Sequence, residues 1–117
     1  MRNKIYSILV ALIVCLNVQA KVDFNLEKAE LAYTAGEYNT ALEVYNSALA
    51  MGYESADLYY NVANCYFRKG ELAASILNYE RALKLDPSHE DAKHNLEFAQ
   101  SRTVDNIDTL GNVFLVE

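Results

Sequence analysis

The sequence predicts an all-α protein built from antiparallel helix-hairpin repeats. When the sequence is aligned with itself so that Gly36 matches Gly70, other residues also match, and Ala48 aligns with Ala82. Within each matching unit the apolar residues recur at intervals of three and four, which is the spacing of one helix face. No stretch alternates apolar and polar residues as a half-buried strand would. Together these observations indicate two stacked hairpins, each turning at a glycine.

The first repeat covers about residues 22–55. We expect its first helix over about residues 23–34 and its second over residues 38–51, with Gly36 in the turn and Gly52 ending the unit. Glycine is favoured after a helix because it adopts a left-handed backbone conformation without a Cβ clash.

The second repeat covers about residues 56–89. The apolar face of its first helix is expected to comprise Leu58, Val62, Cys65 and Tyr66. After the turn at Gly70, the face of its second helix comprises Leu72, Ile76, Tyr79 and Leu83. This second helix is expected to stop at Asp86-Pro87, since proline cannot continue a helix.

A fifth helix is expected over about residues 89–102, with Ser88 as its N-terminal cap. Its apolar stripe comprises Ala92, Asn95, Leu96 and Ala99. A stack of hairpins needs a terminal element that covers its last apolar face, so this helix is interpreted as a cap. Residues 103–117 form a C-terminal tail, polar at first and apolar from Val113 to Val116.

These repeats resemble the tetratricopeptide repeat (TPR). The second unit carries the family's signature residues at their usual spacing, namely Tyr59, Val62, Ala63, Tyr66, Gly70, Tyr79, Ala82 and Pro87. Leu72 and Ser75 replace the usual Tyr and Ala. The resemblance implies a TPR superhelix of two repeats plus a capping helix over residues 21–102.

The first 20 residues have the layout of a secretory signal peptide. Arg2 and Lys4 precede an apolar run from Ile5 to Leu16, and Val18 and Ala20 suit a cleavage site after residue 20. The alternatives are a retained anchor, for which the run is short, and lipid attachment at Cys15, for which Val14 is bulky. The sequence therefore predicts export to the periplasm or to a periplasm-facing position, with membrane association left open.

Charge and cysteine content exclude several classes of function. The chain has a net charge of −6, so it lacks the excess of basic residues that nucleic acid binding requires. Removal of the leader would leave one cysteine, Cys65, which we interpret as a small buried residue. No cluster of Cys and His predicts a metal site, and nothing predicts a cofactor or a small-molecule substrate.

Catalysis is not expected either. The only histidines, His89 and His94, are five residues apart and do not share a helix face. No phosphate-binding loop, nucleophile elbow or HExxH motif occurs. We therefore expect a protein that is not an enzyme.

In the TPR resemblance, the first helix of each pair lines a concave groove that binds partners. The corresponding positions in this chain are Leu26, Glu30, Tyr33, Tyr60, Asn64, Phe67, Arg68, His94, Phe98 and Arg102. An equal alternative for Tyr33, Tyr60 and Phe67 is that they pack one helix against another and do not line the groove. Some TPR domains clamp a C-terminal carboxylate with basic residues and asparagines. We expect that mode to be absent, because acids such as Glu30 and Asp91 stand where cations would be needed.

A narrower resemblance concerns the runs Asp86–Ala92, Asn95–Glu97 and Ser101–Asp105. They are similar to BatE-type TPR proteins of the bacterial aerotolerance (Bat) operon, which are envelope proteins encoded beside von Willebrand A-domain membrane proteins. The resemblance implies a non-catalytic scaffold that binds other envelope proteins within a stress complex.

Two alternatives remain at this point. One is a structural TPR module that self-associates through its apolar tail. The other is a truncated stub of a membrane-anchored TPR/SH3-like protein, because longer members of the group continue beyond the position of Glu117.

Overall fold

The computed structural model describes residues 2–6 and 26–114, with side chains described as far as Asp105. All regular structure within these residues is helical, which confirms the predicted all-α repeat fold. The apolar run of the predicted leader and its cleavage site lie outside the described residues. So does the last part of the predicted apolar tail. Among the helices that are described, none is both long and apolar enough to cross a bilayer.

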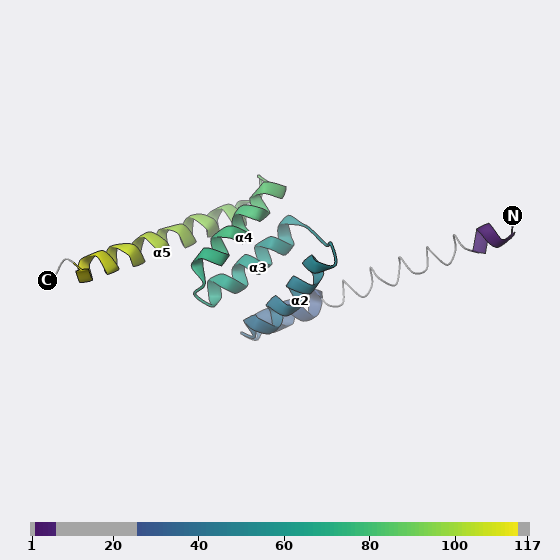
Figure 1. Ribbon diagram of the computed structural model, residues 1–117, viewed down its shortest axis with the longest axis horizontal. Coiled ribbons are helices and arrows are strands. Elements are labelled where there is room, and N and C mark those ends of the chain that lie inside the picture. The colour runs from purple at the N-terminus through teal and green to yellow at the C-terminus, as the bar shows by residue number, and fades with distance from the viewer. Residues whose placement is uncertain (1, 7–25, 115–117) are drawn as a thin grey trace.

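The helices succeed one another across the molecule in chain order (Figure 1). Residues 26–34 are helical, and four further helices follow: α2 (Tyr38–Ala50), α3 (Ala56–Arg68), α4 (Leu72–Leu85) and α5 (Glu90–Phe114). Helix α3 packs against both α2 and α4, and α4 also packs against α5. Each helix therefore contacts its sequence neighbours, which is the arrangement of a repeat array.

The turns of the two hairpins have the same geometry. Gly36 and Gly70 have φ angles of 82° and 78°, in the left-handed region. The residue after each glycine donates its backbone N–H to a carbonyl near the end of the preceding helix. Glu37 donates to the Ala32 carbonyl, and Glu71 donates to the Tyr66 carbonyl. This is the Schellman arrangement, which satisfies carbonyls that a helix end would leave unpaired. The positions of Gly36 and Gly70 therefore determine where the two hairpins turn.

Substituting Gly70 tests how much this conformation matters. We expect Gly70→Ala to lower the free energy of unfolding by about 1 kcal/mol, because a left-handed backbone strains any residue with a Cβ. The added Cβ would meet no atom within 4 Å, so crowding does not contribute. Gly70→Asn should lower the free energy of unfolding by less than Gly70→Ala, since Asn adopts the left-handed backbone region more readily than Ala. Urea unfolding followed by circular dichroism measures both, and equal stability of Gly70→Ala and wild type would contradict the expectation.

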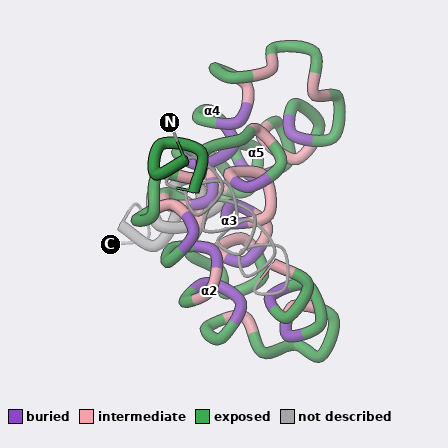
Figure 2. The backbone as a smooth tube through the Cα atoms, turned by 90° about the vertical axis from the view of Figure 1, so that its right-hand side faces the viewer, coloured by how far each residue is buried: buried purple, intermediate pink, exposed green. Residues whose placement is uncertain are grey.

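The core consists of two clusters that meet at α3. The first joins residues 26–34, α2 and α3 around Leu42, Tyr45, Leu58 and Val62. The second joins α3, α4 and α5 around Tyr79, and its other fully buried members are Ala63, Ala82, Ala92 and Ala99. Figure 2 shows buried positions recurring along the helices, while exposed positions gather at the turns. Small residues at these positions allow α4 and α5 to approach closely.

Two serines hold α3 in place. The Ser55 hydroxyl accepts the Leu58 N–H at 3.1 Å and caps the start of the helix. The buried Ser75 hydroxyl of α4 donates to the Ala63 carbonyl at 3.0 Å. Ser75 replaces the alanine usual at this position in the resemblance, and its hydroxyl adds a hydrogen bond between α3 and α4.

Helix α5 differs from expectation at both ends. Ser88 does not cap it, because the Ser88 hydroxyl donates to Asp86 instead, and the His89 Nδ1 atom accepts the Ala92 N–H at 3.1 Å. The helix also continues to Phe114, twelve residues beyond the expected end at about residue 102. No proline or glycine occurs between Arg102 and Gly111, so the sequence supplies no stop signal there.

Candidate partner-binding cavity

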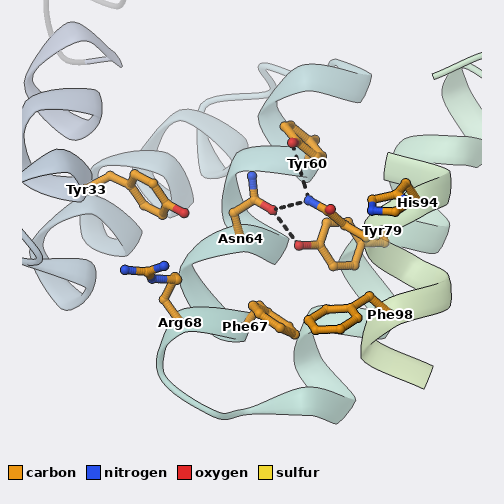
Figure 3. Close-up of a pocket in the computed structure, with 9 residues that line it drawn as sticks. Tyr33, Tyr60, Asn64, Phe67, Arg68, Tyr79, His94 and Phe98 are labelled. Atoms are coloured by element: carbon orange, nitrogen blue, oxygen red, sulfur yellow. Dashed lines mark hydrogen bonds between the residues drawn. The ribbon is translucent and has the colours of Figure 1, made fainter. Parts of the chain in front are cut away.

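A cavity of about 410 Å³ lies between the helical segment 26–34, α3, α4 and α5. We call it the aromatic cavity. Helix α3 supplies more of its lining than any other helix, followed by α5, and single residues come from α4 and from the segment 26–34 (Figure 3). The lining residues are Tyr33, Tyr60, Asn64, Phe67, Arg68, Tyr79, His94, Asn95 and Phe98.

The structure brings together most of the residues predicted for the groove. Seven of the ten line the aromatic cavity: Tyr33, Tyr60, Asn64, Phe67, Arg68, His94 and Phe98. Leu26 and Glu30 line a different hollow near the start of α3. Arg102 lines a third, which adjoins the aromatic cavity at Phe67. Whether these residues bind a partner stays a prediction.

Tyr79 and Asn95 were not among the predicted groove residues. Tyr79 belongs to α4 and was placed on a packing face, yet its hydroxyl reaches Asn64 at the cavity floor. A signal was present in the sequence, because a tyrosine on a buried face needs a hydrogen-bond partner for its hydroxyl. The sequence does not say on which side that partner lies.

A polar network forms the floor of the cavity. The Asn64 Oδ1 atom accepts from the Tyr79 hydroxyl and from Asn95 Nδ2, the latter at 3.2 Å. Asn95 Nδ2 also donates to the Tyr60 hydroxyl at 3.4 Å. Burial raises the pKa of Tyr79 to about 12, so its hydroxyl stays protonated and donates. The network fixes the side chains of three helices relative to one another.

An apolar wall forms where α3 meets α5. The rings of Phe67 and Phe98 lie 5.7 Å apart, centroid to centroid. The Arg102 guanidinium lies over both, at 5.8 Å from the Phe67 ring and 5.3 Å from the Phe98 ring. Phe98 nevertheless remains 50% exposed. This wall therefore remains partly exposed, mainly at Phe98, even with Arg102 over the rings.

The opposite wall is formed by Tyr33 and Arg68, and Tyr38 supports both from outside the cavity. Tyr33 and Tyr38 pack edge to face at 5.4 Å. The Arg68 Nε donates to the Tyr38 hydroxyl at 3.0 Å, and its guanidinium lies 5.6 Å from the Tyr38 ring. Burial raises the pKa of Tyr33, and Arg68 opposes that shift. The wall thus holds a fixed positive charge beside the Tyr33 phenol, which burial keeps protonated.

His89 closes one end of the cavity by supporting Tyr60. Its ring lies 4.9 Å from that of Tyr60. Because the Nδ1 atom accepts a backbone N–H, the neutral ring carries its proton on Nε2, which lies 2.9 Å from Asp57 Oδ1 and donates to it. Both ring nitrogens are therefore engaged, which suits a positioning role.

The charges around the aromatic cavity are unevenly distributed. Its lining includes Arg68 but no Asp or Glu. The hollow at Leu26, of about 340 Å³, is instead lined by the carboxyl groups of Glu27, Glu30 and Asp57. Glu30 and Asp91, the acids expected to repel a carboxylate, are both absent from the lining of the aromatic cavity.

The chemistry available here is that of binding. Cys65 is fully buried, and burial raises the pKa of its thiol to about 11, so it is not an activated nucleophile. Within the described part of the chain, no group of His, Cys, Asp or Glu could hold a metal ion. Aromatic walls, an amide floor and one cation are the features by which proteins recognise a peptide segment.

A family model described as tetratricopeptide repeat matches residues 26–90, which is more than half of the chain. The matched region extends from the start of the helical segment 26–34 to the start of α5, and so includes both glycine turns.

Similar proteins include two that are named for this repeat. Mouse sperm-associated antigen 1 is 33% identical over 63 residues, which is 54% of this chain and 7% of that protein. Human tetratricopeptide repeat protein 16 is 31% identical over 70 residues, 60% of this chain and 8% of that protein. A TPR repeat-containing protein from Methanocaldococcus jannaschii is 31% identical over 58 residues, 50% of this chain and 10% of that protein. The chain thus matches only a small part of these longer relatives.

Proposed function

Since this chain belongs to the tetratricopeptide repeat family, whose repeats are protein–protein interaction modules, we propose that it is a non-catalytic scaffold whose aromatic cavity binds a segment of a partner protein. The observation that carries this proposal is the exposed apolar wall of Phe67 and Phe98 beside the polar floor at Asn64. Such a pairing gives affinity through burial and orientation through hydrogen bonds.

The wall has the properties of an interaction surface. Rings that are already packed together lose little side-chain freedom on binding, so most of the burial energy is retained. Covering the exposed part of an aromatic side chain contributes up to about 2 kcal/mol. Residues of this type, near the centre of an interface, commonly account for much of the binding energy.

Alanine substitution of the wall tests the proposal. We expect Phe98→Ala and Phe67→Ala each to weaken partner binding at least tenfold, as is usual for central aromatic residues of an interface. Phe98 is half exposed, so its loss should leave the helical circular dichroism spectrum unchanged. The readout is co-purification of partner proteins with tagged variants, quantified against wild type.

Leu77→Ala provides the matched control, because Leu77 of α4 is similarly exposed but does not line the cavity. It should recover the same proteins as wild type. If Phe98→Ala and Phe67→Ala also recover them undiminished, the cavity is not the binding site.

We further propose that this scaffold works in the bacterial envelope, within a complex of the Bat type. The support comes from the predicted leader over residues 1–20 and from the similarity of the runs around Asp86–Ala92 and Ser101–Asp105 to BatE-type proteins. Co-purification from an envelope fraction addresses both points. Von Willebrand A-domain membrane proteins should be recovered with wild type and depleted with Phe98→Ala.

A further inference from the structure

Resting on the function proposed above, we infer that the bound segment carries an acidic side chain next to an aromatic or large aliphatic one. The carboxylate is held by Arg68, and the apolar neighbour packs on Phe67 and Phe98. Arg68 and the two phenylalanines line the same cavity of about 410 Å³, so a short segment can contact all three side chains.

Charge complementarity is the first argument. The chain has 16 acidic residues and 10 basic ones, yet among the residues whose side chains are described no Asp or Glu lines the aromatic cavity. Carboxyl groups gather instead at the hollow lined by Glu27, Glu30 and Asp57. A basic peptide would favour that hollow, whereas an acidic one is repelled there and attracted to Arg68 in the aromatic cavity. Phosphate-rich nucleic acid is disfavoured by the net charge of −6.

The geometry of Arg68 is the second argument. Its Nε donates to the Tyr38 hydroxyl, and its plane is placed over the Tyr38 ring. Within the described residues, no carboxylate lies within ion-pair distance of it. The terminal Nη groups therefore remain available, and this edge of a guanidinium can bind a carboxylate through two parallel hydrogen bonds. The contact with Tyr38 fixes the side chain before a partner arrives.

Arg102 is the other cation near the cavity, but it is placed differently. Its guanidinium covers the rings of Phe67 and Phe98, and it lines a separate hollow together with Asp105. A carboxylate that approached Arg102 from that hollow would therefore meet the Asp105 side chain. For this reason we assign recognition of the partner's carboxylate to Arg68.

A displayed library of random twelve-residue peptides provides the probe. Selection on wild type should enrich Asp or Glu directly beside Phe, Tyr, Trp, Leu or Met. Selection on Arg68→Glu should lose that enrichment and favour Lys or Arg at the same position. Arg81→Glu makes the same change of charge on an exposed arginine of α4 that does not line the cavity, so it should select as wild type does.

Binding constants of one selected peptide give the quantitative test. Replacing its acidic residue by the matching amide, or using Arg68→Gln, should each weaken binding about tenfold, which is typical for loss of a charge-assisted hydrogen bond. Applied together, the two changes should weaken it little further, because they remove the same contact. Affinity for the acidic peptide should also fall as salt is raised.

The outcomes separate this inference from the function on which it rests. Selected peptides that lack an acidic preference, and whose binding Phe98→Ala weakens but Arg68→Glu does not, would overturn the inference and leave the binding cavity in place. If no selected peptide depends on Phe98 or Phe67, both proposals fail. Peptides that bind through the hollow at Glu27 and Glu30 would likewise overturn the inference.

Discussion

Replacing Tyr79 by alanine should lower the free energy of unfolding by about 3–5 kcal/mol, as large-to-small substitutions of buried aromatic residues do. Tyr79 is 1% exposed and is the largest fully buried side chain of the described chain. Its cluster partners Ala63, Ala82, Ala92 and Ala99 are all small. Alanines cannot move into the space that the ring would leave, because their only side-chain atom is fixed to the backbone. Larger side chains that pack against the cluster, among them Ile76 and Leu83, can fill only part of that space, so we expect a loss within this range.

Tyr79→Phe separates packing from hydrogen bonding. It keeps the ring and removes the hydroxyl that donates to Asn64, so the loss should be about 1 kcal/mol. Asn64 Oδ1 would still accept from Asn95 Nδ2, so no buried acceptor is orphaned. Urea unfolding at neutral pH measures both variants. If Tyr79→Ala proved no less stable than Tyr79→Phe, the ring would not be the main filler of this cluster.

The fold could be predicted because its information is local and repeated. The turn at Gly36 recurs at Gly70 with nearly the same φ angle, and the residue after each glycine makes the same backbone hydrogen bond. A left-handed turn position and a helical apolar period each depend on a few neighbouring residues, which a sequence shows directly. Ala82 of the second cluster was likewise visible as a repeated small position, since it aligns with Ala48, and Ala92 and Ala99 belong to the expected stripe of the fifth helix.

The parts that sequence could not predict depend on contacts between distant residues. His89 caps α5 through Nδ1 only because Asp57, 32 residues away, engages its Nε2. Seven predicted groove residues come together, but Leu26 and Glu30 were assigned to the same surface and line another hollow. Position along a helix determines which face a side chain occupies. It does not determine whether residues on that face, in different helices, line the same hollow.

The remaining prediction concerns alkaline pH, where we expect the protein to lose most of its stability. Three buried groups have pKa values raised by burial: Tyr45 to about 12, Tyr79 to about 12 and Cys65 to about 11. In the unfolded chain a tyrosine titrates near 10.0 and a cysteine near 9.0. At pH values between the pKa of a group in the unfolded chain and its pKa in the folded protein, the unfolded state binds fewer protons than the folded state. The free energy of unfolding must therefore fall as pH rises.

The size of the effect follows from the pKa shifts. A shift of about two pH units corresponds to roughly 3 kcal/mol per group, and three such groups together approach the whole stability of a small domain, about 5–15 kcal/mol. Stability should be level up to about pH 9 and then fall steeply toward pH 12. The measurement is urea unfolding at a series of pH values, with tyrosinate absorbance recorded in parallel. Ionisation of buried tyrosines should coincide with unfolding and not precede it.

A variant with Tyr45→Phe and Tyr79→Phe gives this prediction its strictest test, because phenylalanine has no proton to lose. At neutral pH the variant should be the less stable protein, since it lacks the hydroxyl that donates to Asn64. At alkaline pH it escapes the ionisation of two of the three groups, so its stability should fall less steeply. The stability curves of variant and wild type should therefore cross between about pH 9 and 12. Parallel curves would mean that the pKa values of these hydroxyls do not differ between the folded and the unfolded chain, which would contradict the prediction.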